Sequence, residues 1–179
     1  MREVRLKVIV AGEPGSGKST ISEVSDACIS LKPFGVSLGL KTVDSEEAQC
    51  RMTFFTWTLT KGRPKDTSYF KGSKAAVIVC DLTKGYTIKK MKNWARSIRK
   101  DIDNIPLVFV GNYVEKAKGD NVELMLKIAK FYDSPVVLTR LEDKDSIEEV
   151  FVQIINAVGP DLWDDRTASE QKDQSPLKA

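Results

Sequence analysis

Short apolar runs are the most regular feature of the chain. Residues 75–80 and 106–110 are apolar throughout, which is typical of strands buried on both faces of a sheet. Other segments combine apolar alternation with β-branched and aromatic residues, and these predict further strands. The predicted strands cover residues 5–11, 36–43, 49–59, 75–80, 106–110 and 135–138. Residues 44–47 form a polar turn, and residues 60–73 read as a surface loop.

Apolar residues at helical spacing separate these strands. Three helices are predicted near residues 18–28, 88–98 and 122–132. A fourth and final helix has the clearest stripe, formed by Ile147, Val150, Phe151, Ile154, Ile155 and Val158. Asp145 with Glu148 predicts a capping box at its start, and Gly159 and Pro160 end it. Alternating strands and helices predict a mostly parallel sheet that binds ligands at the carboxyl ends of its strands.

The turn between the first strand and the first helix is rich in glycine. Gly12, Gly17, Lys18 and Ser19 match the phosphate-binding pattern G-x-x-x-x-G-K-[ST]. Its backbone N–H groups would face a phosphate, Lys18 would reach the β- and γ-phosphates, and Ser19 would ligate Mg²⁺. The predicted phosphate contacts are Glu13, Pro14, Gly15, Ser16, Gly17, Lys18, Ser19 and Thr20. The alternative is a glycine-rich turn that binds nothing.

Composition narrows the possible chemistry. The 179 residues suit one domain, and the absence of histidine excludes imidazole catalysis and histidine–zinc sites. A net charge of +3 without a basic cluster gives no reason to expect nucleic acid. The three cysteines lack metal-ligand spacing and favour a reducing compartment, although a Cys28–Cys50 or Cys28–Cys80 pair stays open. We expect a cytoplasmic protein without a signal peptide or membrane span.

Several strings resemble the Ras superfamily of small GTPases, over roughly residues 4–160. Strings similar to its Rab and Ran branches are Gly35-Val36, Lys41-Thr42-Val43, Asp81-Leu82-Thr83, Asn93-Trp94, Asn104-Ile105-Pro106 and Gly111-Asn112. The resemblance implies a P-loop NTPase of the α/β class. Residues 1–160 would form a small G domain with a mostly parallel six-stranded sheet and about five helices, and residues 161–179 a polar, disordered tail. It also implies GTP or GDP with Mg²⁺ as ligands, and protein effectors or regulators as partners.

The motifs that read the third phosphate in this family depart from its pattern. The family's magnesium-binding threonine of switch I has no counterpart between Leu31 and Val36. The family's Asp-x-x-Gly-Gln holds Mg²⁺, contacts the γ-phosphate and orients the attacking water. The corresponding stretch here is residues 56–61, which begins at Thr56. We therefore expect no catalytic residue and a weakly held Mg²⁺ whose protein ligand is Ser19. Asp81 is either a further magnesium ligand or a turn cap.

The base-reading motifs are also altered. The family's Asn-Lys-x-Asp is here Asn112-Tyr113-Val114-Glu115. The resemblance implies that Asn112, Tyr113 and Glu115 contact a guanine nucleotide, with Glu115 accepting from guanine and the Tyr113 ring stacking. The alternative is that Tyr113 and Glu115 are ordinary loop residues. The family's Ser-Ala-Lys is replaced from Arg140 onward, and we expect Arg140 to be solvated.

Three functions remain open on this sequence. The first is an atypical guanine-nucleotide-binding protein with very slow or absent GTP hydrolysis, acting through partners, as in vesicle trafficking. The second is a pseudo-GTPase scaffold that does not switch with its nucleotide. The third is a P-loop kinase of a small metabolite. The chain ends without a cysteine for prenylation, so no direct membrane anchor is expected.

Overall fold

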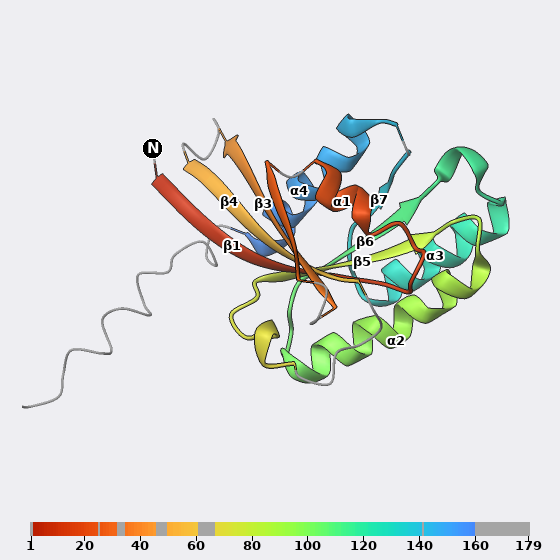
Figure 1. The fold of residues 1–179 in the computed structure, drawn as a ribbon. Coiled ribbons are helices and arrows are strands. Elements are labelled where there is room, and N and C mark those ends of the chain that lie inside the picture. Colours follow the sequence, from red (N-terminus) through yellow and green to blue (C-terminus); the bar gives the residue numbers. More distant parts are fainter. Residues whose placement is uncertain are drawn as a thin grey trace, which may run out of the picture.

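One mixed sheet organises the protein. The computed structural model describes residues 2–24, 26–31, 35–45, 50–60, 67–140 and 142–159. Its strands follow the order β2-β3-β4-β1-β5-β6-β7 (Figure 1). They are β1 (Arg2–Ala11), β2 (Ala27–Leu31), β3 (Val36–Ser45), β4 (Cys50–Leu59), β5 (Ala75–Asp81), β6 (Leu107–Asn112) and β7 (Val136–Leu138). Both antiparallel pairs involve β3, one with β2 and one with β4, and the other four strand pairs are parallel. The predicted mostly parallel α/β class is therefore confirmed.

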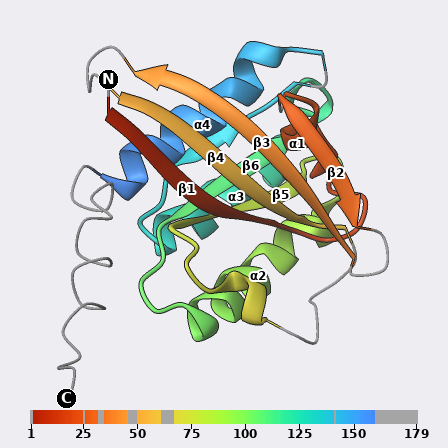
Figure 2. The same ribbon diagram turned by 60° about the vertical axis from the view of Figure 1, so that its left-hand side comes forward.

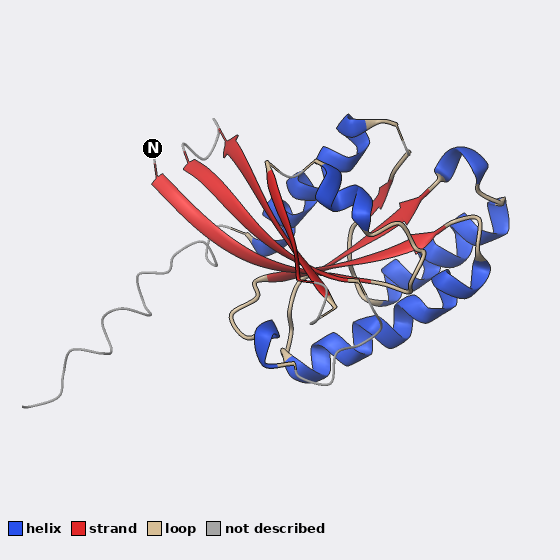
Figure 3. Cartoon of the chain, in the orientation of Figure 1, coloured by secondary structure: helices blue, strands red, loops and turns tan. Residues whose placement is uncertain are grey.

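Helices cover both faces of the sheet (Figures 1 and 3). They are α1 (Ser19–Glu23), α2 (Gly85–Asp101), α3 (Gly119–Phe131) and α4 (Lys144–Val158), with single 3₁₀ turns η2 (Ser68–Phe70) and η3 (Val114–Lys116). Buried residues of α1 and α4 form one core cluster with alternate residues of the central strands. Buried residues of α2 and α3 form a second cluster on the opposite face. Because β5 and β6 lie between the two clusters, every residue of both strands is buried, as their apolar runs predict.

The sheet has a strand that the sequence pattern did not predict. The first helix ends at Glu23 instead of continuing to Cys28, and Ala27–Leu31 forms β2 (Figure 2). The backbone N–H of Asp26 donates to the Leu40 carbonyl, and its carboxylate accepts from the Thr42 N–H at 2.7 Å. These bonds fix the chain antiparallel to β3. The described residues therefore form seven strands and four α-helices, against an expectation of six and about five.

The helix that closes the fold agrees with its predicted stripe but not with its predicted cap. Five of the six stripe residues of α4 are buried, and Phe151 packs edge-on against Phe54 of β4. The capping residue is Asp143, whose side chain accepts from the Ser146 N–H at 3.2 Å. The capping box predicted from Asp145 and Glu148 is therefore wrong. The helix begins at Lys144, before the predicted cap Asp145, because the apolar stripe does not mark the exact first residue of a helix.

Other expectations meet the structure only in part. Cys80 is a free thiol, so the Cys28–Cys80 pair does not form. Burial raises the pKa of this thiol to about 12. Within the predicted loop 60–73, Phe70 is buried, which anchors that loop to the second core cluster. Asp44 and Ser45 of the predicted polar turn belong to β3 instead, and the other two residues of that turn and the predicted tail lie outside the described residues. No helix in the described part of the chain has the length and apolar character needed to cross a bilayer.

Candidate functional site

The glycine-rich turn joins β1 to α1 as a compact loop. Gly15 and Gly17 have φ angles of +78° and +86°, which side-chain-bearing residues rarely adopt. Gly12 has a φ of +150°, and a Cβ there would lie 2.3 Å from the carbonyl oxygen of Val79. The loop thus passes directly against β5 at Gly12. We refer to residues 12–18 as the phosphate loop.

Lys18 reaches back across this loop. Its Nζ donates to the carbonyl oxygens of Gly12 and Glu13, both at 2.8 Å. The residue is buried, and desolvation lowers the pKa of Lys18 to about 8, although the Glu13 carboxylate acts in the opposite direction. A cation held in this way faces the interior of the loop, which is where a phosphate would lie.

The lowered pKa of Lys18 predicts a pH dependence of stability. The pKa falls from 10.5 to about 8 on folding, so between these values the unfolded chain binds more protons than the folded chain. The free energy of unfolding of the nucleotide-free protein should therefore rise from pH 8 to pH 10.5, by up to about 3 kcal/mol. Below pH 8 the penalty for burying the charge is fully present. Denaturant unfolding at pH 7.5, 8.5 and 9.5 measures this rise, and the Lys18→Met variant should lack it.

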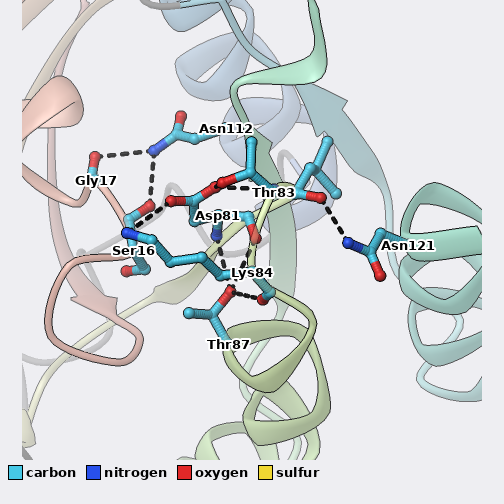
Figure 4. Close-up of polar contacts among 9 residues, drawn as sticks. Ser16, Gly17, Asp81, Thr83, Lys84, Thr87, Asn112 and Asn121 are labelled. Atoms are coloured by element: carbon cyan, nitrogen blue, oxygen red, sulfur yellow. Dashed lines mark hydrogen bonds and ion pairs between the residues drawn. The ribbon is translucent and has the colours of Figure 1, made fainter. Parts of the chain in front are cut away.

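Asn112, at the end of β6, ties the phosphate loop to two strands. Its side-chain amide donates to the carbonyl oxygens of Ser16 at 3.0 Å and Gly17 at 2.9 Å (Figure 4). Its Oδ1 accepts from the Thr139 hydroxyl, just beyond β7. A Cβ on Gly17 would lie 2.4 Å from the same amide nitrogen, so only glycine allows this approach. Asn112 therefore sets the position of the loop relative to the sheet.

Removal of the Asn112 side chain should weaken the fold and the loop together. Asn112→Ala removes one hydrogen bond from each of two loop carbonyls and one from the buried Thr139 hydroxyl, although the Gly17 carbonyl still accepts from Thr20. We expect the free energy of unfolding to fall by about 2–4 kcal/mol. Chemical denaturation measures the change. Asn156→Ala, at an exposed position of α4, is the matched control and should change stability by less than about 0.5 kcal/mol. An equal loss in both variants would contradict the assigned role of Asn112.

The predicted site residues after Asn112 differ in whether they lie near the phosphate loop. Tyr113 adopts a left-handed backbone with φ of +61°, and its ring lies 3.5 Å from the point where a side chain on Gly17 would begin. The Tyr113 ring therefore lies beside the phosphate loop at Gly17. Glu115 is exposed in η3, and its carboxylate makes no hydrogen bond or ion pair with the described residues. Arg140 is exposed as expected, and its backbone N–H donates to Ser146.

The remaining predicted loop residues divide into inward and outward positions. Ser16 and Thr20 are buried, and the Thr20 hydroxyl donates to the Gly17 carbonyl at 2.7 Å. Pro14, Gly15 and Ser19 are exposed. Glu13 is half-buried, and its carboxylate accepts from the indole N–H of Trp94 at 2.9 Å. Thr20 therefore stabilises the loop itself, while Ser19 stays open to a ligand.

Sequence reasoning missed two of these partners. In the sequence, Trp94 belongs only to a predicted helix and to the Asn93-Trp94 string of the family resemblance, and Thr139 carries no motif. Their roles arise from contacts between residues that lie 81 and 27 positions apart. For Thr139, its position just after a predicted strand would have been the available signal, because strand ends meet at one edge of a parallel sheet.

A magnesium ion fits the described residues poorly. They contain no cluster of three or more acidic, cysteine or histidine side chains. Asp81 caps its own turn, accepting from the Thr83 N–H and hydroxyl at 2.8 and 2.6 Å and pairing with Lys84 at 3.1 Å. Thr56 and Thr58, near the end of β4, offer only buried neutral hydroxyls, and neither hydroxyl has a hydrogen-bond partner in the described part of the chain. Ser19 alone remains as a candidate ligand among these residues.

Comparison with known proteins agrees with this geometry. The model of the Ras family matches residues 7–159. Ras-related protein Rab-22A of Homo sapiens is 32% identical over 162 residues, covering 83% of this chain and 81% of that protein. Ras-related protein Rab-31 of Rattus norvegicus is 32% identical over 169 residues, covering 87% and 84%. Ras-related protein Rab-18-B of Danio rerio is 25% identical over 173 residues, covering 89% and 82%.

Proposed function

The chain belongs to the Ras family as a Rab-like small GTPase, and from this premise we propose that it binds guanine nucleotide but hydrolyses GTP very slowly or not at all. In this proposal it acts as a regulatory module that binds protein effectors or regulators, in vesicle trafficking as the Rab resemblance implies. One contrast carries the proposal. The phosphate loop is complete, whereas the end of β4 presents Thr56 and Thr58 where hydrolysis in this family needs a carboxylate.

The loop supports binding of the first two phosphates. Gly15 and Gly17 have the backbone that turns N–H groups inward, and Lys18 brings a cation to the same concavity. Asn112 holds the loop against the sheet. All of these contacts are made by the protein's own groups, which favours a loop that is ordered in advance and lowers the cost of binding. We infer that affinity for a diphosphate is retained.

Hydrolysis needs more than binding. A positioned water and a magnesium ion that neutralises the developing charge supply most of the rate in this family. Bound Mg²⁺ would supply electrostatic stabilisation of the phosphates, and Ser19 is the described residue placed to hold it. Threonine hydroxyls at positions 56 and 58 cannot replace a charged oxygen ligand. The expected hydrolysis rate is therefore below the intrinsic rate of about 10⁻⁴ s⁻¹ that small GTPases reach.

Calorimetric titration with GDP, GTP, ADP and ATP tests the proposal directly. We expect GDP and GTP to bind with similar affinity and the adenine nucleotides at least about tenfold more weakly. Single-turnover assays with GTP should show no product within an hour. Absence of binding by either guanine nucleotide would overturn the proposal, and so would steady GTP turnover by the purified protein.

Base preference should depend on Glu115. Its carboxylate is the acceptor proposed for the guanine N–H groups, so Glu115→Ala should lower GDP affinity about tenfold and leave ADP affinity unchanged. Asp103→Ala removes an exposed carboxylate from the turn after α2 and serves as the matched control. An unchanged ratio of GDP to ADP affinity in Glu115→Ala would show that Glu115 does not read the base.

The buried threonines also favour a second candidate, a scaffold that does not switch. Because the end of β4 carries Thr56 and Thr58 instead of a carboxylate that could hold Mg²⁺ beside the γ-phosphate, GDP and GTP would leave the protein in one conformation. Hydrogen exchange over residues 35–45 and 67–74 separates the two candidates. A difference between the GDP and GTP complexes in these segments would exclude the non-switching scaffold.

A further inference from the structure

Lys84 lies in the turn between β5 and α2, next to the phosphate loop. Its Nζ is 3.1 Å from Oδ2 of Asp81, whose side chain is only 4% exposed, whereas the Lys84 side chain is 47% exposed. A second feature concerns Gly15 of the phosphate loop. The ammonium lies 3.9 Å from the point where a side chain on Gly15 would begin. One cation is therefore shared between a buried carboxylate and the open rim of the loop.

The turn that carries Lys84 is held on every side. Asp81 accepts from the backbone and hydroxyl of Thr83. The Thr87 hydroxyl accepts from the Asp81 N–H at 3.0 Å and donates to the Lys84 carbonyl at 2.8 Å. Asn121 of α3 donates to the Leu82 carbonyl at 2.8 Å (Figure 4). The hydrogen bonds fix the backbone of the turn, and the ion pair with Asp81 holds the Lys84 ammonium at the Gly15 side of the loop.

The ion pair also fixes the charge of Lys84. Its contact with Asp81 raises the pKa of Lys84, whereas burial lowers the pKa of Lys18 to about 8. Lys84 therefore keeps its full charge at pH values where Lys18 begins to lose it. An ammonium has three N–H donors, and the Asp81 carboxylate needs only one of them. The others remain available to a phosphate oxygen at the rim of the loop.

We propose that Lys84 is a second phosphate-binding cation, held by Asp81 at the Gly15 side of the phosphate loop, and that it lets this protein bind a nucleoside diphosphate with little need for a divalent cation. The inference rests on the proposed function. It accounts for a loop that is complete beside a poor magnesium site, because Lys18 and Lys84 approach the phosphates from two sides and supply the positive charge. A lysine suits this role as a compact point charge on a flexible stem.

The test compares GDP affinities of the full chain in 5 mM EDTA and in 5 mM Mg²⁺ at one ionic strength. The wild type should bind GDP in both, with affinities within about tenfold of each other. Lys84→Gln should weaken GDP binding in EDTA by about ten- to a hundredfold, the effect of losing a charge-assisted hydrogen bond to phosphate. Lys90→Ala, at an exposed position of α2, should leave the affinity unchanged.

A double variant separates attraction from relief of repulsion. Lys84→Gln alone leaves the Asp81 carboxylate unpaired beside the phosphates, and that charge would itself repel GDP. Asp81→Asn combined with Lys84→Gln removes both charges and leaves the net charge unchanged. Persistent weakening in the double variant supports Lys84 as a phosphate ligand. Recovery of wild-type affinity would overturn the proposal, because Lys84 would then only shield Asp81.

Two further outcomes are distinct. If the wild type binds GDP in Mg²⁺ but more than about a hundredfold less tightly in EDTA, the inference fails while the proposed function stands. If the wild type binds no guanine nucleotide in either buffer, the proposed function fails and the inference with it. Lys84→Arg provides a check on folding and charge, since it keeps the cation and should retain most of the affinity.

Discussion

Gly12→Ala is expected to lower the free energy of unfolding by about 4 kcal/mol. Two independent effects add at this position. An alanine Cβ would lie 2.3 Å from the Val79 carbonyl oxygen and 2.9 Å from the Ser16 hydroxyl, and the backbone has a φ of +150°. The Val79 oxygen belongs to a central strand between two core clusters, so it cannot move away without shifting β5. Relief would have to come from the loop, which would lose its shape.

Chemical denaturation with matched variants tests this expectation. Gly119→Ala, at the first residue of α3, has no heavy atom within 4 Å of its new Cβ, and alanine there should leave stability unchanged or slightly increased. A Gly12→Ala protein as stable as the wild type would mean that the phosphate loop and β5 approach less closely than described. Since the steric contact involves backbone, Gly12→Ser should be destabilised at least as much as the alanine variant.

Lys18→Ala should reduce affinity for GDP by at least about a hundredfold. Lys18 is the only buried cation among the described residues of the phosphate loop, and its ammonium already lies within the concavity at 2.8 Å from two loop carbonyls. Its removal takes away charge and hydrogen-bond donors that no other loop side chain can replace. Affinity for guanosine, which lacks phosphates, should not change, and this comparison shows that the loss concerns phosphate.

The control for Lys18→Ala is Lys100→Ala, an exposed lysine in the last turn of α2. Fluorescence titration with a labelled GDP gives both affinities in one assay. A Lys18→Ala protein that keeps GDP affinity within about threefold would contradict the phosphate role of the loop. In that case the binding energy would have to come from the base contacts near Tyr113.

The parts of the fold that sequence predicts well are those that local pattern determines. The buried strands β5 and β6 and the stripe of α4 are periodic over several residues, and each lies where its pattern indicates. The phosphate loop is also local, because its glycines and Lys18 form one continuous motif. These features need no knowledge of distant neighbours.

The parts that sequence predicts poorly depend on partners far along the chain. Strand β2 forms because Asp26 makes hydrogen bonds with Leu40 and Thr42 of β3, and the sequence pattern of residues 18–31 does not predict that pairing. The sequence allows the Asp81 carboxylate to be either a magnesium ligand or a turn cap. Its contacts with Thr83 and Lys84 in the structure show that it caps the turn. The site residues themselves stay predictions about binding, since geometry places Ser19 and Glu115 without assigning them a ligand.

The hydrogen bond between Trp94 and Glu13 links the intrinsic fluorescence of this protein to the phosphate loop. The indole N–H of a core residue on α2 donates to a carboxylate that belongs to the phosphate loop. Indole emission responds to the field and mobility of such a neighbour, so occupation of the loop would change the colour or intensity of Trp94 fluorescence. Loading and release of a ligand would then be followed in real time on unlabelled protein.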